Sequence, residues 1–286
     1  MPLTQQRHMH PRRSFLFAPG SKPDIFPKAL ASGADIVCVD LEDAVAPALK
    51  AAARAPSLAF LAGTGGTPER ALRLNPVRSL EGARDLAFLA DHAPIASGLL
   101  VLTKVDDPEE LRIVDALLTE HGSGLQVVPL IETARGLDKV MEIAAAPRVA
   151  SLLFGAVDLA AELGIPVARE PLLYARSRVV HAAKRAGIGV FDVPCLDFRD
   201  LDGVRAESEV AKQLGFTGKA VLHPSNVALV NAVFTPGAAE IAAAEAIIAA
   251  FKASPAGLVV IDGKLIEKPV VRAAERVIAR AKAMHA

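Results

Sequence analysis

The stretch LQVVPLIETARG (residues 125–136) decides the fold, because an unbroken apolar run meets a carboxylate within one step. An apolar run without polar alternation is typical of a strand buried on both faces, as in parallel sheets covered by helices. Glu132 follows this run directly. Because an unpaired carboxylate is costly to bury, the sequence predicts a strand whose carboxyl end opens onto a polar site.

The chain of 286 residues contains seven other apolar runs of this kind, at near-regular spacing. They are SFLFAPG (14–20), ADIVCVDLED (34–43), RALRLNP (70–76), GLLVLTKV (98–105), VASLLFGAVD (149–158), GIGVFDVP (187–194) and GKAVLHP (218–224). Helical stretches, several of which end at glycine, separate the runs. Eight such units favour an α/β fold with a closed (β/α)8 TIM barrel. The first run is not followed by GxGxxG, which removes the main support for a dinucleotide-binding fold.

The chain divides into three expected parts. Residues 1–12 read as a flexible N-terminal tail, residues 13–235 as the barrel domain, and residues 236–286 as a C-terminal segment. This last segment reads as a helix, a hairpin with Asp262 and Gly263 in its turn, and a final helix that begins near Pro269. Such an appendage can close over the barrel mouth as a lid, or pack on a neighbouring subunit.

Composition excludes several classes of protein. Hydrophobic residues make up 52% of the chain, which is typical of a well-buried globule, and Lys plus Arg equals Asp plus Glu at 32 each. This balance gives no reason to expect nucleic-acid or membrane-surface binding. We find no apolar run of the ~18 to 20 residues that a spanning helix needs, and no secretory signal. Cys38 and Cys195 lie in apolar stretches, so we expect buried, inert thiols in a cytoplasmic protein.

Charged and polar residues collect where the predicted strands end. In a (β/α)8 barrel the loops at these ends form one shared cup, and functional groups sit there. The residues are Ser21, Lys22, Asp40, Glu42, Asp43, Arg73, Asn75, Lys104, Glu132, Asp158, Asp192 and His223.

Glu132 and Asp158 predict a metal site. They end consecutive predicted strands, and neighbouring strands lie about 4.8 Å apart, so both carboxylates can reach one point. Two carboxylates, with water or a chelating ligand in the other positions, suit Mg²⁺. Zn²⁺ is disfavoured because no His or Cys accompanies the pair at ligand spacing. The alternative is that each carboxylate caps the following helix.

Arg73 is expected to point inward near the barrel top, because strand alternation puts Leu72 and Leu74 on the helix side. Its guanidinium can grip a substrate carboxylate, or balance the acidic end of the second strand. Asp43 is the candidate for acid–base work. Lys104 is assigned to substrate binding together with Glu132, although it and His223 could equally pair with rim carboxylates.

Several motifs, taken in order, resemble a known family. They are FLFAPGSKPD, VDLEDAV, LRLNP, LTKV, IETARG, FGAVDLA and LGFTGKAVLHPSNV, and the similarity runs from about residue 13 to the end of the chain. The chain is similar to citrate lyase beta-subunit-like proteins of the HpcH/HpaI aldolase superfamily. The resemblance implies a Mg²⁺-dependent carbon–carbon lyase with Glu132 and Asp158 as metal ligands and Arg73 as the carboxylate clamp.

The same resemblance implies an α-keto acid and an acyl-CoA or carrier-bound thioester as substrates, and a homo-oligomer, either a trimer or a hexamer. Relatives that act on malyl-, citramalyl- or citryl-CoA usually carry a catalytic Asp in a C-terminal segment that reaches a neighbouring subunit. Here Glu267 stands in that place. Two alternatives stay open: a thioesterase that uses the same cup, and a subunit that acts only within a multienzyme citrate lyase.

Overall fold

The computed structural model describes residues 12–63, 66–254, 258–261 and 263–284. The chain forms two compact units, one covering Arg12–Asn231 and the other including Ala232–Ala286. The expected tail, apart from Arg12, lies outside the described residues. The guanidinium of Arg12 donates to Glu69 (2.7 Å) and Gln126 (3.4 Å).

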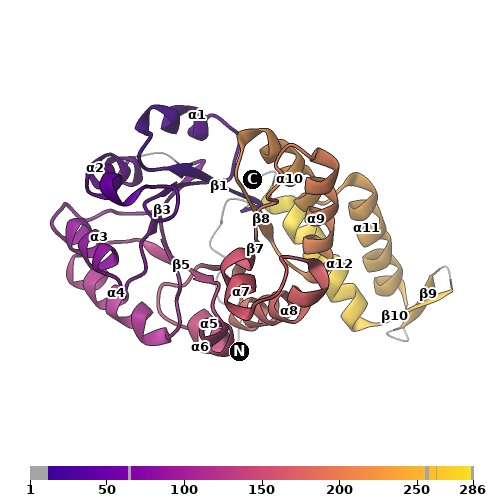
Figure 1. Cartoon of the computed structure of the whole chain (residues 1–286). Coiled ribbons are helices and arrows are strands. Elements are labelled where there is room, and N and C mark those ends of the chain that lie inside the picture. Colours follow the sequence, from indigo (N-terminus) through magenta and orange to yellow (C-terminus); the bar gives the residue numbers. More distant parts are fainter. Residues whose placement is uncertain (1–11, 64–65, 255–257, 262, 285–286) are drawn as a thin grey trace. The chain divides into compact units, whose positions relative to one another are not determined.

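Eight parallel strands close into a barrel in the order of the sequence, which confirms the predicted fold class (Figure 1). The strands are β1 (Ser14–Pro19), β2 (Ile36–Asp40), β3 (Glu69–Leu74), β4 (Leu99–Leu102), β5 (Gln126–Ile131), β6 (Ser151–Phe154), β7 (Gly189–Asp192) and β8 (Gly218–Val221). The ring closes where β1 pairs with β8, with Ser14 opposite Lys219.

Alternate residues of the strands fill the barrel. Phe15, Cys38, Val101 and Phe191 belong to one buried cluster inside it, and the rings of Phe15 and Phe191 meet edge to face at 5.2 Å. Cys38 is fully buried, as expected. Cys195 is not: it lies half-exposed after β7, because the strand has already ended at Asp192 and the chain there is a loop.

Helices follow the strands. They are α1 (Phe26–Leu30), α2 (Lys50–Leu61), α3 (Leu80–Ala90), α4 (Pro108–Glu120), α5 (Ala134–Asp138), α6 (Val140–Ala144), α7 (Ala156–Leu163), α8 (Arg169–Ala186), α9 (Leu201–Leu214) and α10 (Val227–Phe234), with short 3-10 turns η1 (Pro23–Ile25), η2 (Pro47–Leu49) and η3 (Pro224–Asn226). Gly187 and Gly215 end α8 and α9 in the left-handed conformation that glycine adopts most readily.

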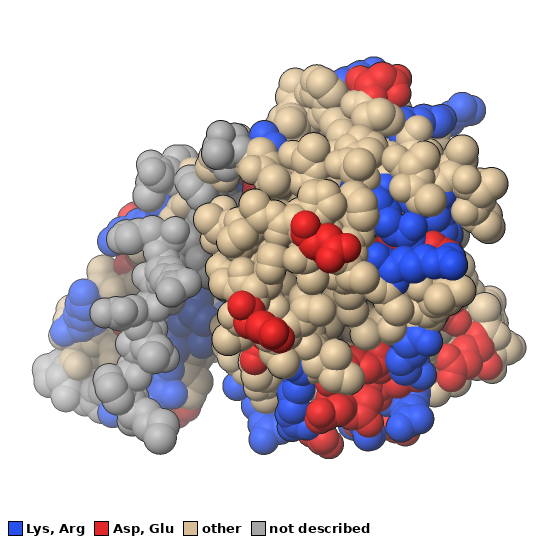
Figure 2. All heavy atoms as spheres, turned by 90° about the vertical axis from the view of Figure 1, so that its left-hand side faces the viewer, with Lys and Arg blue, Asp and Glu red and all other residues tan. Residues whose placement is uncertain are grey.

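The face that includes α2, α3 and α4 mixes charges of both signs. Figure 2 shows Lys and Arg lying among Asp and Glu on this side of the molecule. The view agrees with the equal totals of acidic and basic residues and shows no field of a single sign.

The residues Pro224–Ala253 form a long apolar helical run, whereas the sequence predicts no membrane-spanning helix. By length and composition alone, Pro224–Ala253 qualifies as a candidate span, with 30 residues and a hydropathy of 1.5. The run consists of separate helices, because Thr235, Pro236 and Gly237 lie between α10, which has 8 residues, and α11 (Ala238–Ala253), which has 16. Neither helix alone reaches the ~20 residues needed to cross a bilayer.

The second unit is a helix, a hairpin and a helix, as predicted. After α11 come β9 (Val259–Ile261) and β10 (Lys264–Ile266), which pair antiparallel, and then α12 (Lys268–Ala283). Gly263 has a φ of 75°, which suits its place in the hairpin turn; Asp262 lies outside the described residues.

Candidate active site

Glu132 directly follows β5 and is 3% exposed. Its Oε1 accepts a hydrogen bond of 2.8 Å from the backbone N–H of Lys104, which follows the neighbouring strand β4. Gly155 provides the space beside it, because a Cβ at this position would lie 2.7 Å from Glu132 Oε2. The carboxylate that ends the apolar run is therefore held by the next strand's backbone.

Asp158 lies elsewhere than the sequence predicted. It was expected at the end of the sixth strand, but β6 ends at Phe154 and Asp158 falls in the first turn of α7. The chain turns at Gly155, which begins the helix. A carboxylate in a first helical turn is favoured by the helix dipole. Asp158 Oδ1 lies 3.4 Å from Lys104 Nζ, so it still reaches the same cup as Glu132.

Glu42 is a third carboxylate at this place. It is 5% exposed, and its Oε2 has no hydrogen-bond partner among the described residues, although Arg73 forms an ion pair with it at 3.1 Å. Burial, followed in smaller measure by the charges of nearby carboxylates, raises the pKa of Glu42 to about 7. The same two causes, with Glu42 and Asp158 as the charges, raise the pKa of Glu132 to about 8.

Sequence reasoning gave Asp43, not Glu42, the acid–base role. Cys38 lies inside the barrel and Asp40 shares its side of β2, but the strand ends at Asp40, so Glu42 and Asp43 lie in the loop that follows. Asp43 is exposed. Strand alternation does not extend past Asp40, so it could not separate Glu42 from Asp43. The catalytic role of Asp43 stays a prediction.

Arg73 lies at the rim, and two nitrogens of its guanidinium donate hydrogen bonds to the Asp40 carboxylate. Nε donates to Asp40 Oδ1 at 2.7 Å and a second nitrogen donates to Oδ2 at 2.5 Å. The role of balancing the acidic end of β2 is thus present in the structure. The remaining nitrogen forms the ion pair with Glu42, and the substrate clamp stays a prediction that would use this edge.

Lys50 holds the loop after β2 through hydrogen bonds. Its ammonium donates to the carbonyl oxygens of Leu41 and Glu42, both at 2.8 Å, and to Asn75 Oδ1 at 2.6 Å. Asn75 in turn donates to Asp85, at 2.7 Å. Asn75, taken from the sequence as a rim residue, therefore supports the loop that carries Glu42.

The remaining candidate residues make other contacts. Asp192 is fully buried and pairs with Arg176 at 2.8 Å and Lys219 at 2.9 Å. His223 is exposed, and its ring stacks on Phe198 at 5.2 Å. Glu267 is the residue before α12, in the second unit, where its carbonyl accepts from Val270 and its side chain makes no capping bond.

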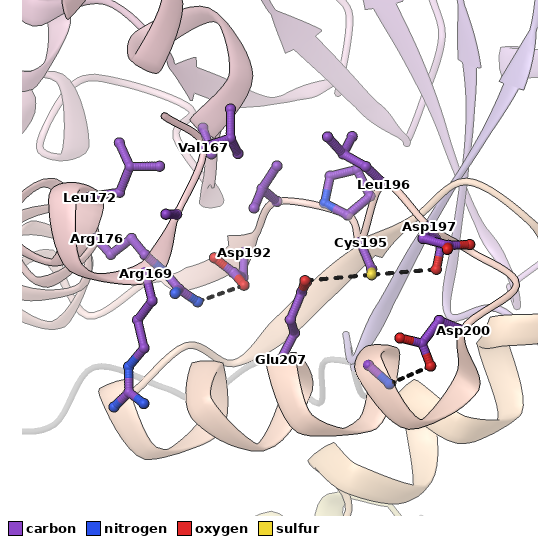
Figure 3. Close-up of a pocket in the computed structure, with 15 residues that line it drawn as sticks. Val167, Arg169, Leu172, Arg176, Asp192, Cys195, Leu196, Asp197, Asp200 and Glu207 are labelled. Carbon is purple, nitrogen blue, oxygen red and sulfur yellow. Dashed lines mark hydrogen bonds and ion pairs between the residues drawn. The ribbon is translucent and has the colours of Figure 1, made fainter. Parts of the chain in front are cut away.

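A cavity of about 360 Å³ lies beside the Asp192 pair, between α8, α9 and the loop after β7 (Figure 3). Cys195 and Glu207 face each other in it at 3.5 Å. Glu132, Asp158 and Lys104 do not line this cavity. The polar rim, rather than this cavity, therefore carries the candidate chemistry.

The rim suits a divalent cation held by few protein ligands. Within the described part of the chain, no three His, Cys, Asp or Glu side chains form a ready-made metal cluster. Mg²⁺ commonly takes one or two carboxylates and completes its shell with water and substrate. Glu132 and Asp158 stay the predicted ligands, and nearby carboxylates add in smaller measure to the burial that raises the pKa of Glu132 and Glu42.

Fold and rim together define a TIM-barrel protein with a carboxylate-lined cup at the carboxyl ends of its strands. Comparison with known proteins then gives the family: residues 13–224 match the HpcH/HpaI aldolase/citrate lyase family, and the chain belongs to it.

Two relatives from Cereibacter sphaeroides match almost end to end. One, an L-malyl-CoA/beta-methylmalyl-CoA lyase, is 34% identical over 306 residues, covering 96% of each chain. Another, a (3S)-malyl-CoA thioesterase, is 35% identical over 283 residues, covering 97% of each. A solved structure of CitE from Mycobacterium tuberculosis, in complex with magnesium, acetoacetate and coenzyme A, is 31% identical with a TM-score of 0.82, covering 96% of this chain and 100% of that one.

Proposed function

We propose that this protein is a Mg²⁺-dependent carbon–carbon lyase. It cleaves a hydroxy-carboxy acyl-CoA into an α-keto acid and an acyl-CoA, or forms it from them. The observation that carries this proposal is the meeting of Glu132, Asp158 and Glu42 around Lys104. Family membership and the malyl-CoA lyase relative support it, as does the magnesium in the CitE structure.

Each rim residue has a role in this reaction. Glu132 and Asp158 would hold the cation, which when bound supplies Lewis-acid stabilisation of the substrate oxygens and a template for them. The Arg73 nitrogen that pairs with Glu42 would orient the substrate carboxylate, because a guanidinium offers directed donors. A carboxylate acts as acid or base at the thioester fragment; Glu267 is the candidate by resemblance, and Asp43 is the other.

Replacing the two proposed ligands tests the function. Glu132→Ala and Asp158→Ala should each lower lyase activity on malyl-CoA, citramalyl-CoA or citryl-CoA by at least about 10³-fold, because the cation loses its anchor. The fold should survive. Glu109→Gln is the matched control, since Glu109 is an exposed acid of α4 paired with Arg112. A fully active, Mg²⁺-responsive Asp158→Ala protein would refute the site.

A thioesterase is the second candidate, because one relative of 35% identity carries that name. Both reactions start from the same substrate and differ in their products. Lysis of malyl-CoA gives glyoxylate and acetyl-CoA, whereas hydrolysis gives malate and free CoA. Measuring free thiol and keto acid in the same reaction decides between them: thiol without keto acid means hydrolysis.

A further inference from the structure

Lys104 contacts the rim carboxylates through two different groups. Its backbone N–H donates to Glu132 Oε1 at 2.8 Å. Its ammonium lies 3.4 Å from Asp158 Oδ1 and 4.0 Å from Glu42 Oε1. One residue therefore occupies the space among the side chains to which the proposed function gives a cation.

The backbone at Lys104 does not itself call for a lysine. Its φ is 51°, in the left-handed region that glycine and asparagine adopt more readily. The strand end is held in this shape by Arg78, which donates to the Lys104 carbonyl at 2.9 Å. Glycine would satisfy the backbone at lower cost, so the ammonium is what lysine adds at this position.

We propose that Lys104 is a positioning residue that neutralises Glu42, Glu132 and Asp158 in the metal-free protein and releases them when the divalent cation binds. Three crowded carboxylates need positive charge, and the lysine supplies it in place of the metal. The inference rests on the proposed function, since it concerns the same site.

The ammonium is free to move. Its side chain is 39% exposed, and its flexible stem lets it leave the carboxylates without moving the backbone. A divalent cation and an ammonium repel each other strongly over a few ångströms in a half-buried site. Lys104 therefore weakens cation binding, which keeps the metal exchangeable.

Titration of the metal-free protein with Mg²⁺ tests this directly, at about pH 9, above the ordinary range of carboxyl groups. Lys104→Met and Lys104→Gly should each bind Mg²⁺ at least about tenfold more tightly than wild type, because the competing charge is gone. Glycine adopts the left-handed backbone conformation at this position without strain. The glycine variant therefore still tests the proposal if the methionine variant misfolds. Lys104→Arg, which retains the charge, should stay within about threefold of wild type.

Lys139→Met is the matched control. Lys139 is 36% exposed and also pairs with an aspartate, Asp107, which caps the start of α4. Its loss should leave Mg²⁺ affinity unchanged. Equal or weaker binding by both Lys104→Met and Lys104→Gly, compared with wild type, would overturn the proposal.

A second measurement needs no metal. In the presence of a chelator at about pH 9, Lys104→Met should lower the thermal midpoint. Adding Glu42→Gln should recover most of that loss, because the unbalanced charge is removed. A double variant as unstable as Lys104→Met alone would overturn the charge-balancing role. If wild type binds no Mg²⁺ in the titration, the proposed function fails, and this cycle still decides what Lys104 does.

Discussion

At the scale of single residues, ionising the Glu132 carboxyl is unfavourable in the folded protein. It lies at the end of a buried strand, surrounded by Glu42 and Asp158, and burial is the largest cause of its raised pKa of about 8. The unfolded chain would give the carboxyl its ordinary pKa of 4.5. Between these two values the folded state binds the extra proton, so folding and protonation are linked at this residue.

The linkage predicts how stability changes with pH. The contribution of Glu132 to the unfolding free energy is fully present below about pH 4.5, the pKa in the unfolded chain. It is lost as the pH rises through about 8, the pKa in the folded protein. The metal-free protein should therefore lose up to about 1.4 kcal/mol of unfolding free energy per pH unit from this group over pH 6 to 8. Glu132→Gln cannot titrate and should flatten the profile.

Urea unfolding in the presence of a chelator, from about pH 6 to about pH 9, measures this slope. Glu109→Gln, at an exposed position, is the control and should retain the wild-type slope. Identical slopes for wild type and Glu132→Gln would mean that the carboxyl is already ionised at neutral pH.

At the scale of elements, the strands were predictable and the strand ends were not. Runs such as LQVVPLI (125–131) are apolar because helices cover one face and the barrel core fills the other, so their composition alone indicates them. VASLLFGAVD (149–158) misled, because α7 is as apolar as the strand before it, and Gly155 is the signal that separates the two. Side-chain pairing, such as Asp192 with Arg176, depends on distances between elements that no single stretch contains.

The loop between β2 and α2 shows what such pairing does. Lys50 donates three hydrogen bonds, two of them to the carbonyls of Leu41 and Glu42. Charge-assisted bonds are worth about 1.5–3 kcal/mol each when isolated, and less when shared. Lys50→Met should lower the unfolding free energy by about 2–4 kcal/mol. It should also lower kcat, because the loop that carries Asp43, a candidate acid–base residue, is no longer held in place.

Chemical denaturation and steady-state kinetics of Lys50→Met check both effects. Lys28→Met, at an exposed position of α1, should leave stability and kcat near wild type. A Lys50→Met protein with lowered stability and a full kcat would show that the loop does not need this anchor for chemistry.

At the scale of the whole molecule, the chain is two units. From the family resemblance we propose that Glu267 of the second unit serves the cup of a neighbouring chain. Glu267 is exposed and makes no side-chain capping bond at the start of α12, so its carboxyl is available to another chain. This arrangement predicts complementation between two inactive proteins. Glu267→Gln retains the metal ligands, and Asp158→Asn retains Glu267.

Co-expression of the two variants should restore activity. In a randomly mixed oligomer, about a quarter of the cups combine an intact Asp158 with an intact Glu267 from the neighbour, so about a quarter of wild-type activity is expected. Each variant alone should be nearly inactive, and light scattering of the mixture should give the mass of a trimer or a hexamer. If Glu267 serves the cup of its own chain, no mixed cup is complete and activity stays absent; if Glu267→Gln alone is active, the acid–base role belongs to another carboxylate such as Asp43.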